Sequence, residues 1–289
     1  MKFLYLNPLE KVLAERYRLT EGARKAAEES LRHANSRIGE YEAALAQARR
    51  HIHNAALWPA RIANSFRPPQ AGPRHLQLRW LAPDQALLSE SFNDDLTLQL
   101  RLPALHLQFM KAGRPVPHVF DMEDRSPAEV EAWILVELLH RGLARDQFSK
   151  TLPFEIPAPM TGDSEKYIPA ELEAELSALT VWLASAASIL LSLAPSLDHG
   201  VWLDPELLHL NVAPVAAGAT AAKAPMQIGF AMGVERQGGP YFYVVPQNNG
   251  TVQDLRPDAM LSAQTISEKA MSADAIRQFL HEAAFQKAG

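Results

Sequence analysis

The spacing of hydrophobic residues changes several times along the chain, and each change indicates a different kind of element. Over residues 7–53 apolar residues recur every three or four positions, which is typical of a helix. After residue 75 they recur at every second position, which is typical of a strand with two unlike faces. Helical spacing returns over 126–143 and 169–193. The pattern predicts an α+β fold, with an N-terminal helical segment followed by a mostly antiparallel sheet covered by two helices.

The later part of the N-terminal helix carries a heptad repeat. Its apolar positions alternate in steps of three and four residues, as in the seam of a coiled coil. These positions are Leu31, Ala34, Ile38, Tyr41, Leu45, Ala48 and Ile52. Either the body of the same chain or a second copy must cover such a seam. The sequence leaves both open, so a homodimer through residues 31–52 is one of two predictions.

A proline-rich stretch separates the helical pattern from the strands. It contains Pro59, Pro68, Pro69, Gly72 and Pro73. Because proline ends or kinks a helix, we expect a linker there. The predicted organisation is a helical segment at 1–56, a linker at 57–74, a main domain at 75–246, and a polar linker with a C-terminal helix at 247–289.

Four short runs after the linker alternate apolar and polar residues, as half-buried strands do. They lie at residues 76–80, 96–102, 105–109 and 116–120. Ser126-Pro127-Ala128-Glu129 then has the spacing of a helix capping box, with proline at the first helical position. The sequence therefore predicts that the first covering helix begins directly after Ser126.

Residues 226–246 are predicted to form a hairpin with one nearly bare face. Ile228, Phe230, Met232 and Val234 share one face of the first strand, while Gly229, Ala231 and Gly233 share the other. A strand face without side chains allows close approach of another group, either a helix or a ligand. Because the helix over 169–193 carries small residues, we expect it to cover this face; the alternative is a small-molecule pocket.

Composition narrows the function classes. The chain has 289 residues, 47% hydrophobic and 21% charged, as in ordinary globular proteins, and it has no cysteine. Disulfides and thiolate chemistry are therefore excluded, and the absence of cysteine is compatible with a reducing cytoplasm, where we expect the protein. The N-terminus lacks a signal peptide's apolar core, and the most apolar run is too short to cross a membrane.

Charge is distributed unevenly, since residues 1–75 contain 13 Lys and Arg against 7 Asp and Glu, although the whole chain has a net charge of −5. No phosphate-binding loop or aromatic-interleaved basic patch accompanies this excess, so we expect neither nucleic-acid nor membrane partners. Motifs of serine hydrolases, dinucleotide-binding enzymes and zinc proteases are also absent.

Two small groups of residues are candidates for chemistry. Asp204, Glu206 and His209 offer oxygen and imidazole ligands for a divalent metal, although Asp204-Pro205-Glu206 is also an ordinary turn sequence. The candidate ligand-binding residues are Trp202, Tyr241, Tyr243 and Glu155. The two tyrosines share a strand face and could line a pocket or pack across strands, and Glu155 could be buried or project into solvent. We expect no cofactor and no tightly bound transition metal.

Several segments in a fixed order carry a family resemblance. They are the helix opened by Ser126-Pro127-Ala128-Glu129 with Trp133, Phe154-Glu155-Ile156-Pro157 before a helix bearing Trp182-Leu183, Trp202, Ile228-Gly229, and Pro240-Tyr241-Phe242-Tyr243-Val244. Over residues 96–246 the chain resembles a family of uncharacterised bacterial proteins with a domain of unknown function. The family's polar residues after the Trp202 and Gly229 positions are displaced or absent here, so the resemblance implies no reaction.

Two classes of function follow from these observations. The first is a non-enzymatic binding or structural protein that uses the heptad helix or the Tyr241/Tyr243 face. The second is an enzyme or metal-dependent activity centred on residues 202–209. The absence of catalytic motifs favours the first.

Overall fold

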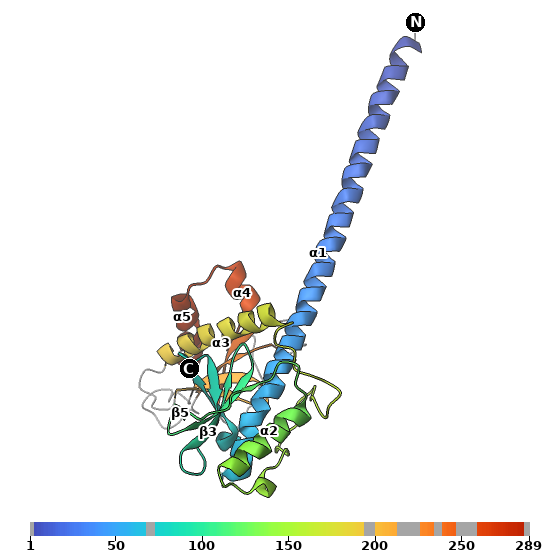
Figure 1. Ribbon diagram of the computed structural model, residues 1–289. Coiled ribbons are helices and arrows are strands. Elements are labelled where there is room, and N and C mark those ends of the chain that lie inside the picture. The colour runs from blue at the N-terminus through green and yellow to red at the C-terminus, as the bar shows by residue number, and fades with distance from the viewer. Residues whose placement is uncertain are drawn as a thin grey trace. The chain divides into compact units, whose positions relative to one another are not determined.

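The computed structural model describes residues 3–67, 73–193, 200–212, 226–233, 239–246 and 259–285. It divides into two compact units, Met1–Ala46 and Gln47–Gly289, which are considered separately below. Helices and antiparallel strands together form an α+β fold, as the pattern of hydrophobic residues predicts (Figure 1).

The sheet consists of two antiparallel meanders joined at their first strands. The first contains β1 (Leu78–Leu81), β2 (Ala86–Leu88), β3 (Leu96–Arg101) and β4 (His106–Lys111), with the short β5 (Arg114–Pro115) and β6 (Phe120–Asp121) pairing with β4. The second contains β7 (Val201–Asp204), β8 (His209–Val212), β9 (Met226–Ala231), β10 (Tyr241–Pro246) and β11 (Met260–Ser262). The strand order is β11-β10-β9-β8-β7-β1-β2-β3-β4-β5, so the pairing of β1 with β7 makes one sheet of the two halves.

Three hairpins of this sheet use the same four-residue connection. Residues 82–85, 102–105 and 205–208 are all turns, and each ends in a residue with positive φ: Gln85, Leu105 and Leu208 at 47°, 53° and 56°. A left-handed last residue is what a short hairpin loop needs to return the chain in register. The predicted hairpin of β9 and β10 is confirmed, with Tyr243 opposite Gly229 and Tyr241 opposite Ala231.

The two predicted covering helices are present. α2 (Pro127–His140) begins with the capping box, since Ser126 Oγ accepts from Glu129 N and the Glu129 carboxylate accepts from Ser126 N. Trp133 of α2 packs its ring against Phe109 and Phe120, with ring centroids 5.6 and 5.1 Å apart. α3 (Glu173–Leu193) packs against β7, β8 and β9.

α3 is long and apolar enough to cross a membrane by length and composition alone. In the fold its apolar face is instead buried within the protein: Leu176, Leu179, Thr180, Leu183, Ala186, Ala187 and Leu190. α5 (Ala273–Phe285) packs against α3, β9 and β10. The short α4 (Ala263–Glu268) and the strand β11 lie in a stretch where the sequence indicated only a polar linker.

Helix α1 (Phe3–Phe66) continues ten residues beyond its expected end, directly through Pro59. A proline inside a helix removes one hydrogen bond and costs about 3 kcal/mol. The surrounding residues offset this cost because almost all of them are buried: Ala55, Ala56, Leu57, Trp58, Ala60, Ile62 and Ala63. Tertiary burial therefore keeps residues 57–66 helical where local sequence favours a linker.

The same part of α1 holds a long segment without regular structure, residues 148–168, in place. Asn54 bonds to two nearby points in the middle of the segment, since its Nδ2 donates to Ala158 O at 3.1 Å and its Oδ1 accepts from Met160 N at 2.7 Å. Other backbone carbonyls of the segment accept from Arg50, Arg61 and Asn64 of α1. Side chains of one helix therefore replace the hydrogen bonds that a sheet or helix would supply.

We expect Asn54→Ala to lower the free energy of unfolding by about 1–3 kcal/mol, because it leaves the buried backbone N–H of Met160 without its acceptor. Urea denaturation would measure the loss. Asn35→Ala, at an exposed position of the same helix, serves as the control and should change stability by about 0.5 kcal/mol or less. Equal stability of the two variants would contradict this account of the segment.

Candidate functional site

Strand register brings five of the predicted site residues onto one face of the sheet. Residues directly opposite in antiparallel strands point to the same side. One transverse row runs through Trp202, Asn211, Gly229 and Tyr243, and the next through Asp204, His209, Ala231 and Tyr241. Trp202, Asp204, His209, Tyr241 and Tyr243 therefore lie within two adjacent rows, although Trp202 and Tyr243 are 41 positions apart.

The bare position at Gly229 is covered by the sheet's own side chains. A Cβ atom placed on Gly229 would lie 2.4 Å from Tyr243 Cζ and 2.5 Å from Asn211 Oδ1. The Tyr243 ring thus lies across the glycine, and its hydroxyl donates to Asn211 Oδ1 at 2.6 Å. The expected cover by the 169–193 helix is wrong at this position, because neighbouring strands already fill the space.

Gly233 differs from Gly229 in its surroundings. It follows the end of β9 with a φ of 94°, and the backbone of Gly239 lies 2.6 Å from where its Cβ would be. Arg49 Nη1 donates to the carbonyl of Gly233 at 2.9 Å. Glycine is needed here for its backbone conformation and for the close approach of the return strand.

Tyr241, Tyr243 and His209 form a buried aromatic cluster rather than an open surface. Tyr241 and Tyr243 are each 1% exposed, and the His209 ring lies 5.4 Å from Tyr243 and 6.4 Å from Tyr241 between centroids. Among the described residues, neither His209 Nδ1 nor the Tyr241 hydroxyl has a hydrogen-bond partner. The cluster therefore contains two buried polar atoms whose hydrogen-bonding capacity is unused.

His209, the histidine of this cluster, is uncharged at neutral pH because it is buried. Burial, and to a smaller extent the nearby His53 of α1, lower the pKa of His209 to about 4. Burial also lowers the pKa of His53, whose Nε2 lies 2.9 Å from Pro205 O. Burial raises the pKa of Asp204, although two backbone N–H groups and His53 act in the opposite direction.

The structure does not bring Asp204, Glu206 and His209 together as metal ligands. Asp204 Oδ1 accepts from Glu206 N at 2.8 Å, so this carboxylate closes the turn that its sequence also suggested. Glu206 is exposed on that turn, whereas His209 is buried in β8. Glu155 lies apart from all of them, exposed in the 148–168 segment, so the solvent-facing interpretation holds for it.

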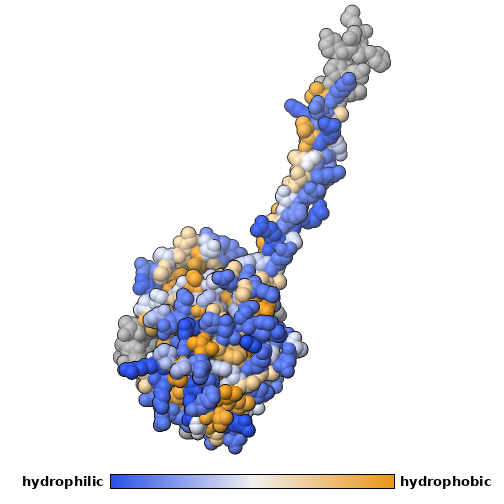
Figure 2. All heavy atoms as spheres, viewed as in Figure 1, coloured by the Kyte–Doolittle hydropathy of each residue, from blue (hydrophilic) through white to orange (hydrophobic). Residues whose placement is uncertain are grey.

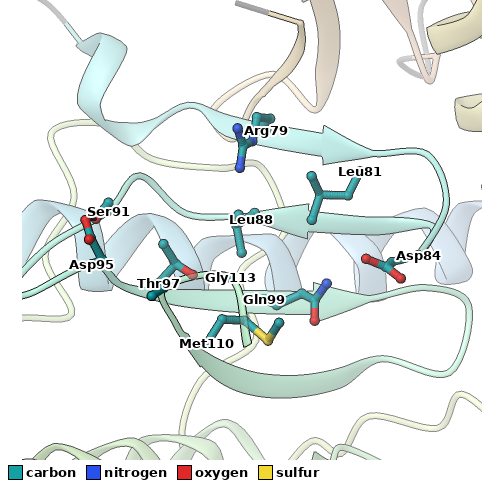
Figure 3. Close-up of a pocket in the computed structure, with 11 residues that line it drawn as sticks. Arg79, Leu81, Asp84, Leu88, Ser91, Asp95, Thr97, Gln99, Met110 and Gly113 are labelled. Atoms are coloured by element: carbon teal, nitrogen blue, oxygen red, sulfur yellow. Dashed lines mark hydrogen bonds between the residues drawn. The ribbon is translucent and has the colours of Figure 1, made fainter. Parts of the chain in front are cut away.

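A shallow hollow of about 360 Å³ lies farther along the same sheet face, over β1–β4 (Figure 3). Arg79, Leu88 and Gln99 form part of its floor and continue the row of Trp202, because Arg79 pairs with both Trp202 and Leu88. Asp84 and Asp95 lie at its margins, and α1 lies on the opposite side of these strands. The hollow is open and of mixed polarity, unlike the enclosed apolar pockets that usually hold small ligands.

The heptad seam of α1 has two parts with opposite burial. Ala48 and Ile52 are fully buried. Toward the N-terminus the large seam residues are exposed, and the same register, interrupted by Arg24 and Thr20, continues back to Tyr17 and Leu13. The exposed fractions are 59% for Leu13, 70% for Tyr17, 63% for Leu31, 55% for Ile38 and 48% for Tyr41. Figure 2 shows scattered hydrophobic residues in orange among polar ones along this helix.

A further cluster was missed from the sequence: His118, Glu137 and His140. Glu137 Oε1 lies 3.1 Å from His118 Nδ1 and 3.6 Å from His140 Nδ1. The spacing of Glu137 and His140 by three residues places them on one helix face, which is a usable signal. His118 could not be assigned to it, because that residue comes from the connection between β5 and β6.

Comparison of the chain with protein-family models, curated proteins and solved structures found no match. The resemblance to an uncharacterised bacterial family therefore stays a prediction.

We expect Gly229→Ala to lower the free energy of unfolding by about 1–3 kcal/mol, because the added methyl group would overlap the Tyr243 ring and Asn211. Thermal and urea denaturation would measure the loss. In a Tyr243→Ala background the same substitution should cost much less, since the overlapping ring is gone. If the cost is equal in both backgrounds, the ring is not what requires glycine here.

The pKa of His209 predicts how stability depends on pH. Its value of about 4 in the folded protein lies below its ordinary 6.5, so the unfolded chain binds more protons between these values. The unfolding free energy should therefore fall as pH drops from 6.5 to 4, with His209 contributing up to about 1.4 kcal/mol per pH unit. The raised pKa of Asp204 has the opposite effect, because it favours the folded state as the pH falls. Asp204 is present both in the wild type and in the His209→Gln variant described next.

Urea denaturation of wild type and His209→Gln over this pH range would measure the slope. The unfolding free energy of the variant should fall less steeply as the pH drops. Part of the fall should remain, because burial also lowers the pKa of His51 to about 4. His33→Gln, at an exposed position, should retain the wild-type slope. An unchanged slope in His209→Gln would mean that the buried imidazole is not destabilised by protonation.

Proposed function

We propose that this protein is a non-enzymatic binding protein that pairs with a second copy of itself through residues 13–41 of α1. The observation that carries the proposal is the exposed seam. Five large apolar or aromatic side chains, each about half exposed or more, repeat at coiled-coil spacing. A row of this kind favours a partner helix, because a helix in a protein gains most of its stability by packing its apolar face against another element.

The charges beside the seam support a second copy in parallel orientation. With Leu31 and Ile38 at a positions, Arg37 is at g and Glu42 at the e position of the following heptad. In a parallel coiled coil these two positions face each other across the interface, and opposite charges there set partner choice and orientation. Arg16 and Glu21 repeat the same relation near the N-terminal end.

An antiparallel pair is disfavoured by the same residues. In that orientation g positions face g positions, so arginine would meet arginine, and the favourable pairs would be lost. Arg24 occupies an a position, where it forms ion pairs with Glu21 and Glu28 of its own helix at 3.1 and 3.4 Å. A polar residue at one a position lowers stability but fixes the register.

The alternative, an enzyme or metal-dependent activity at residues 202–209, has less support. Tyr241, Tyr243 and His209 are buried, and Asp204 is used in a turn, so the segment offers no accessible group of converging polar side chains. We also propose a reducing compartment such as the cytoplasm, since the chain contains no cysteine.

We expect the wild-type protein to sediment as a dimer and the Ile38→Asp variant to sediment as a monomer. Ile38 occupies an a position, so a charge there removes apolar burial from both helices. Core lesions of this kind cost about 2–5 kcal/mol each. Sedimentation equilibrium at micromolar concentration would measure the change. Ala43→Asp, at the outward f position in the same part of the helix, is the matched control and should remain dimeric.

Charge reversal tests the orientation. Arg37→Glu should weaken the dimer, and the double change Arg37→Glu with Glu42→Arg should restore it, because the parallel pairing regains opposite charges. A monomeric wild-type protein would overturn the proposed function. A dimer that Ile38→Asp leaves intact would show that another surface joins the copies.

A further inference from the structure

The cluster of His118, Glu137 and His140 combines two exposed imidazoles with one buried carboxylate. The Glu137 side chain is only 3% exposed, whereas those of His118 and His140 are 65% and 57% exposed. A buried carboxylate requires partners, because removing its charge from water is costly. Glu137 has one such partner, Arg141, besides the two histidines.

Arg141 determines which oxygen of Glu137 is available. Its Nη1 donates to Glu137 Oε2 at 2.5 Å and to the Glu137 backbone carbonyl at 2.6 Å. The guanidinium also lies 4.5 Å over the ring of Phe109, which fixes it from the other side. Oε2 is thus held by the arginine, and Oε1 is left facing the two imidazoles.

Both carboxylate–imidazole separations in the cluster are close to those between two ligands of one metal ion. All three candidate ligand atoms lie within 4.8 Å of one another, and Oε1 is 3.1 and 3.6 Å from the two Nδ1 atoms. Zinc binds imidazole nitrogen and carboxylate oxygen at about 2.0–2.2 Å in a tetrahedral arrangement, so two ligands lie about 3.4 Å apart. In the part of the chain that the structure describes, no other group of three such residues has this geometry.

We propose that His118, Glu137 and His140 bind a divalent cation of the zinc class, which ties the end of α2 to the connection between β5 and β6. Two imidazoles and one carboxylate suit zinc and its neighbours better than magnesium or calcium, which prefer oxygen ligands alone. Three protein ligands leave a fourth position for water, and the exposure of both histidines opens that position to solvent.

Arg141 has the role of a residue that orients a metal ligand through a hydrogen bond. Its positive charge also opposes a second cation nearby, so the affinity should be lower than that of a site without it. The site is independent of the helix seam, since none of its residues lies in α1. The proposed site differs from the expectation, based on the sequence, that the protein holds no tightly bound transition metal.

The test uses the untagged full-length chain, stripped of metal with a chelator and titrated with Co²⁺. Cobalt in a site of low coordination number absorbs visible light, so the titration reports both stoichiometry and geometry. We expect one Co²⁺ per chain, displaced by Zn²⁺, and a thermal midpoint that rises with Zn²⁺ concentration. His118→Ala and His140→Ala should each weaken binding at least tenfold.

His106→Ala is the matched control, because His106 also faces a carboxylate, with Nε2 3.7 Å from Asp121 Oδ1, but among the described residues this pair belongs to no group of three candidate ligands. It should bind Co²⁺ like wild type. The two exposed histidines carry the test, since Glu137→Gln would disturb the buried contact with Arg141 and could unfold the helix end. Absence of the cobalt spectrum, or equal affinity in wild type and both histidine variants, would overturn the proposal.

Discussion

The pairing of β1 with β7 is the contact on which the rest of the sheet depends. It involves only two residue pairs, Leu78 with Leu203 and Arg79 with Trp202, yet it joins two strands that lie more than 100 residues apart in the chain. Without it each meander would have an exposed edge at its first strand, which is a site for unwanted pairing. With it, the transverse rows of side chains continue from the open hollow over β1–β4 to the buried tyrosines of β10.

The last 20 residues of α1, from residue 47 to Phe66, give the 148–168 segment a fixed course. Polar side chains of this helix bond to the backbone of the segment at intervals, from Arg50 and Asn54 to Asn64. Buried indole and phenol groups add a contact, since Trp58 Nε1 donates to the Tyr167 hydroxyl at 3.2 Å. An irregular chain can thus be ordered when another element satisfies its backbone groups.

Burial makes the two predicted site tyrosines of the sheet inaccessible from the surface. Tyr241 and Tyr243 share a strand face, but they fill space over Ala231 and Gly229 instead of lining a pocket. Two exposed features of the described residues stand out, the seam of residues 13–41 and the cluster at the end of α2. The first favours a partner by its apolar spacing, and the second favours a cation by its ligand set.

The sequence by itself determined the features that depend on neighbours along the chain. Alternation specified β1, β3 and β4, a capping box specified the start of α2, and heptad spacing specified the seam, because each pattern reflects a local backbone geometry. Alternation did not indicate β2, and the strand that it predicted over 116–120 is wrong, because residues 116–119 form an irregular connection between β5 and β6. It also determined which candidate residues could share a strand face. Only the tertiary structure decided which strands from distant parts of the chain would pair, and so that Trp202, His209 and Tyr243 would meet.

Tertiary structure likewise decided the exceptions to local rules. Burial on all sides kept α1 helical through Pro59, the Tyr243 ring took the place expected for a helix over Gly229, and His118 came beside Glu137 from another element. These outcomes depend on the free energy of packing groups that are remote in sequence. No period or short motif records that energy, because it arises only when the chain is folded.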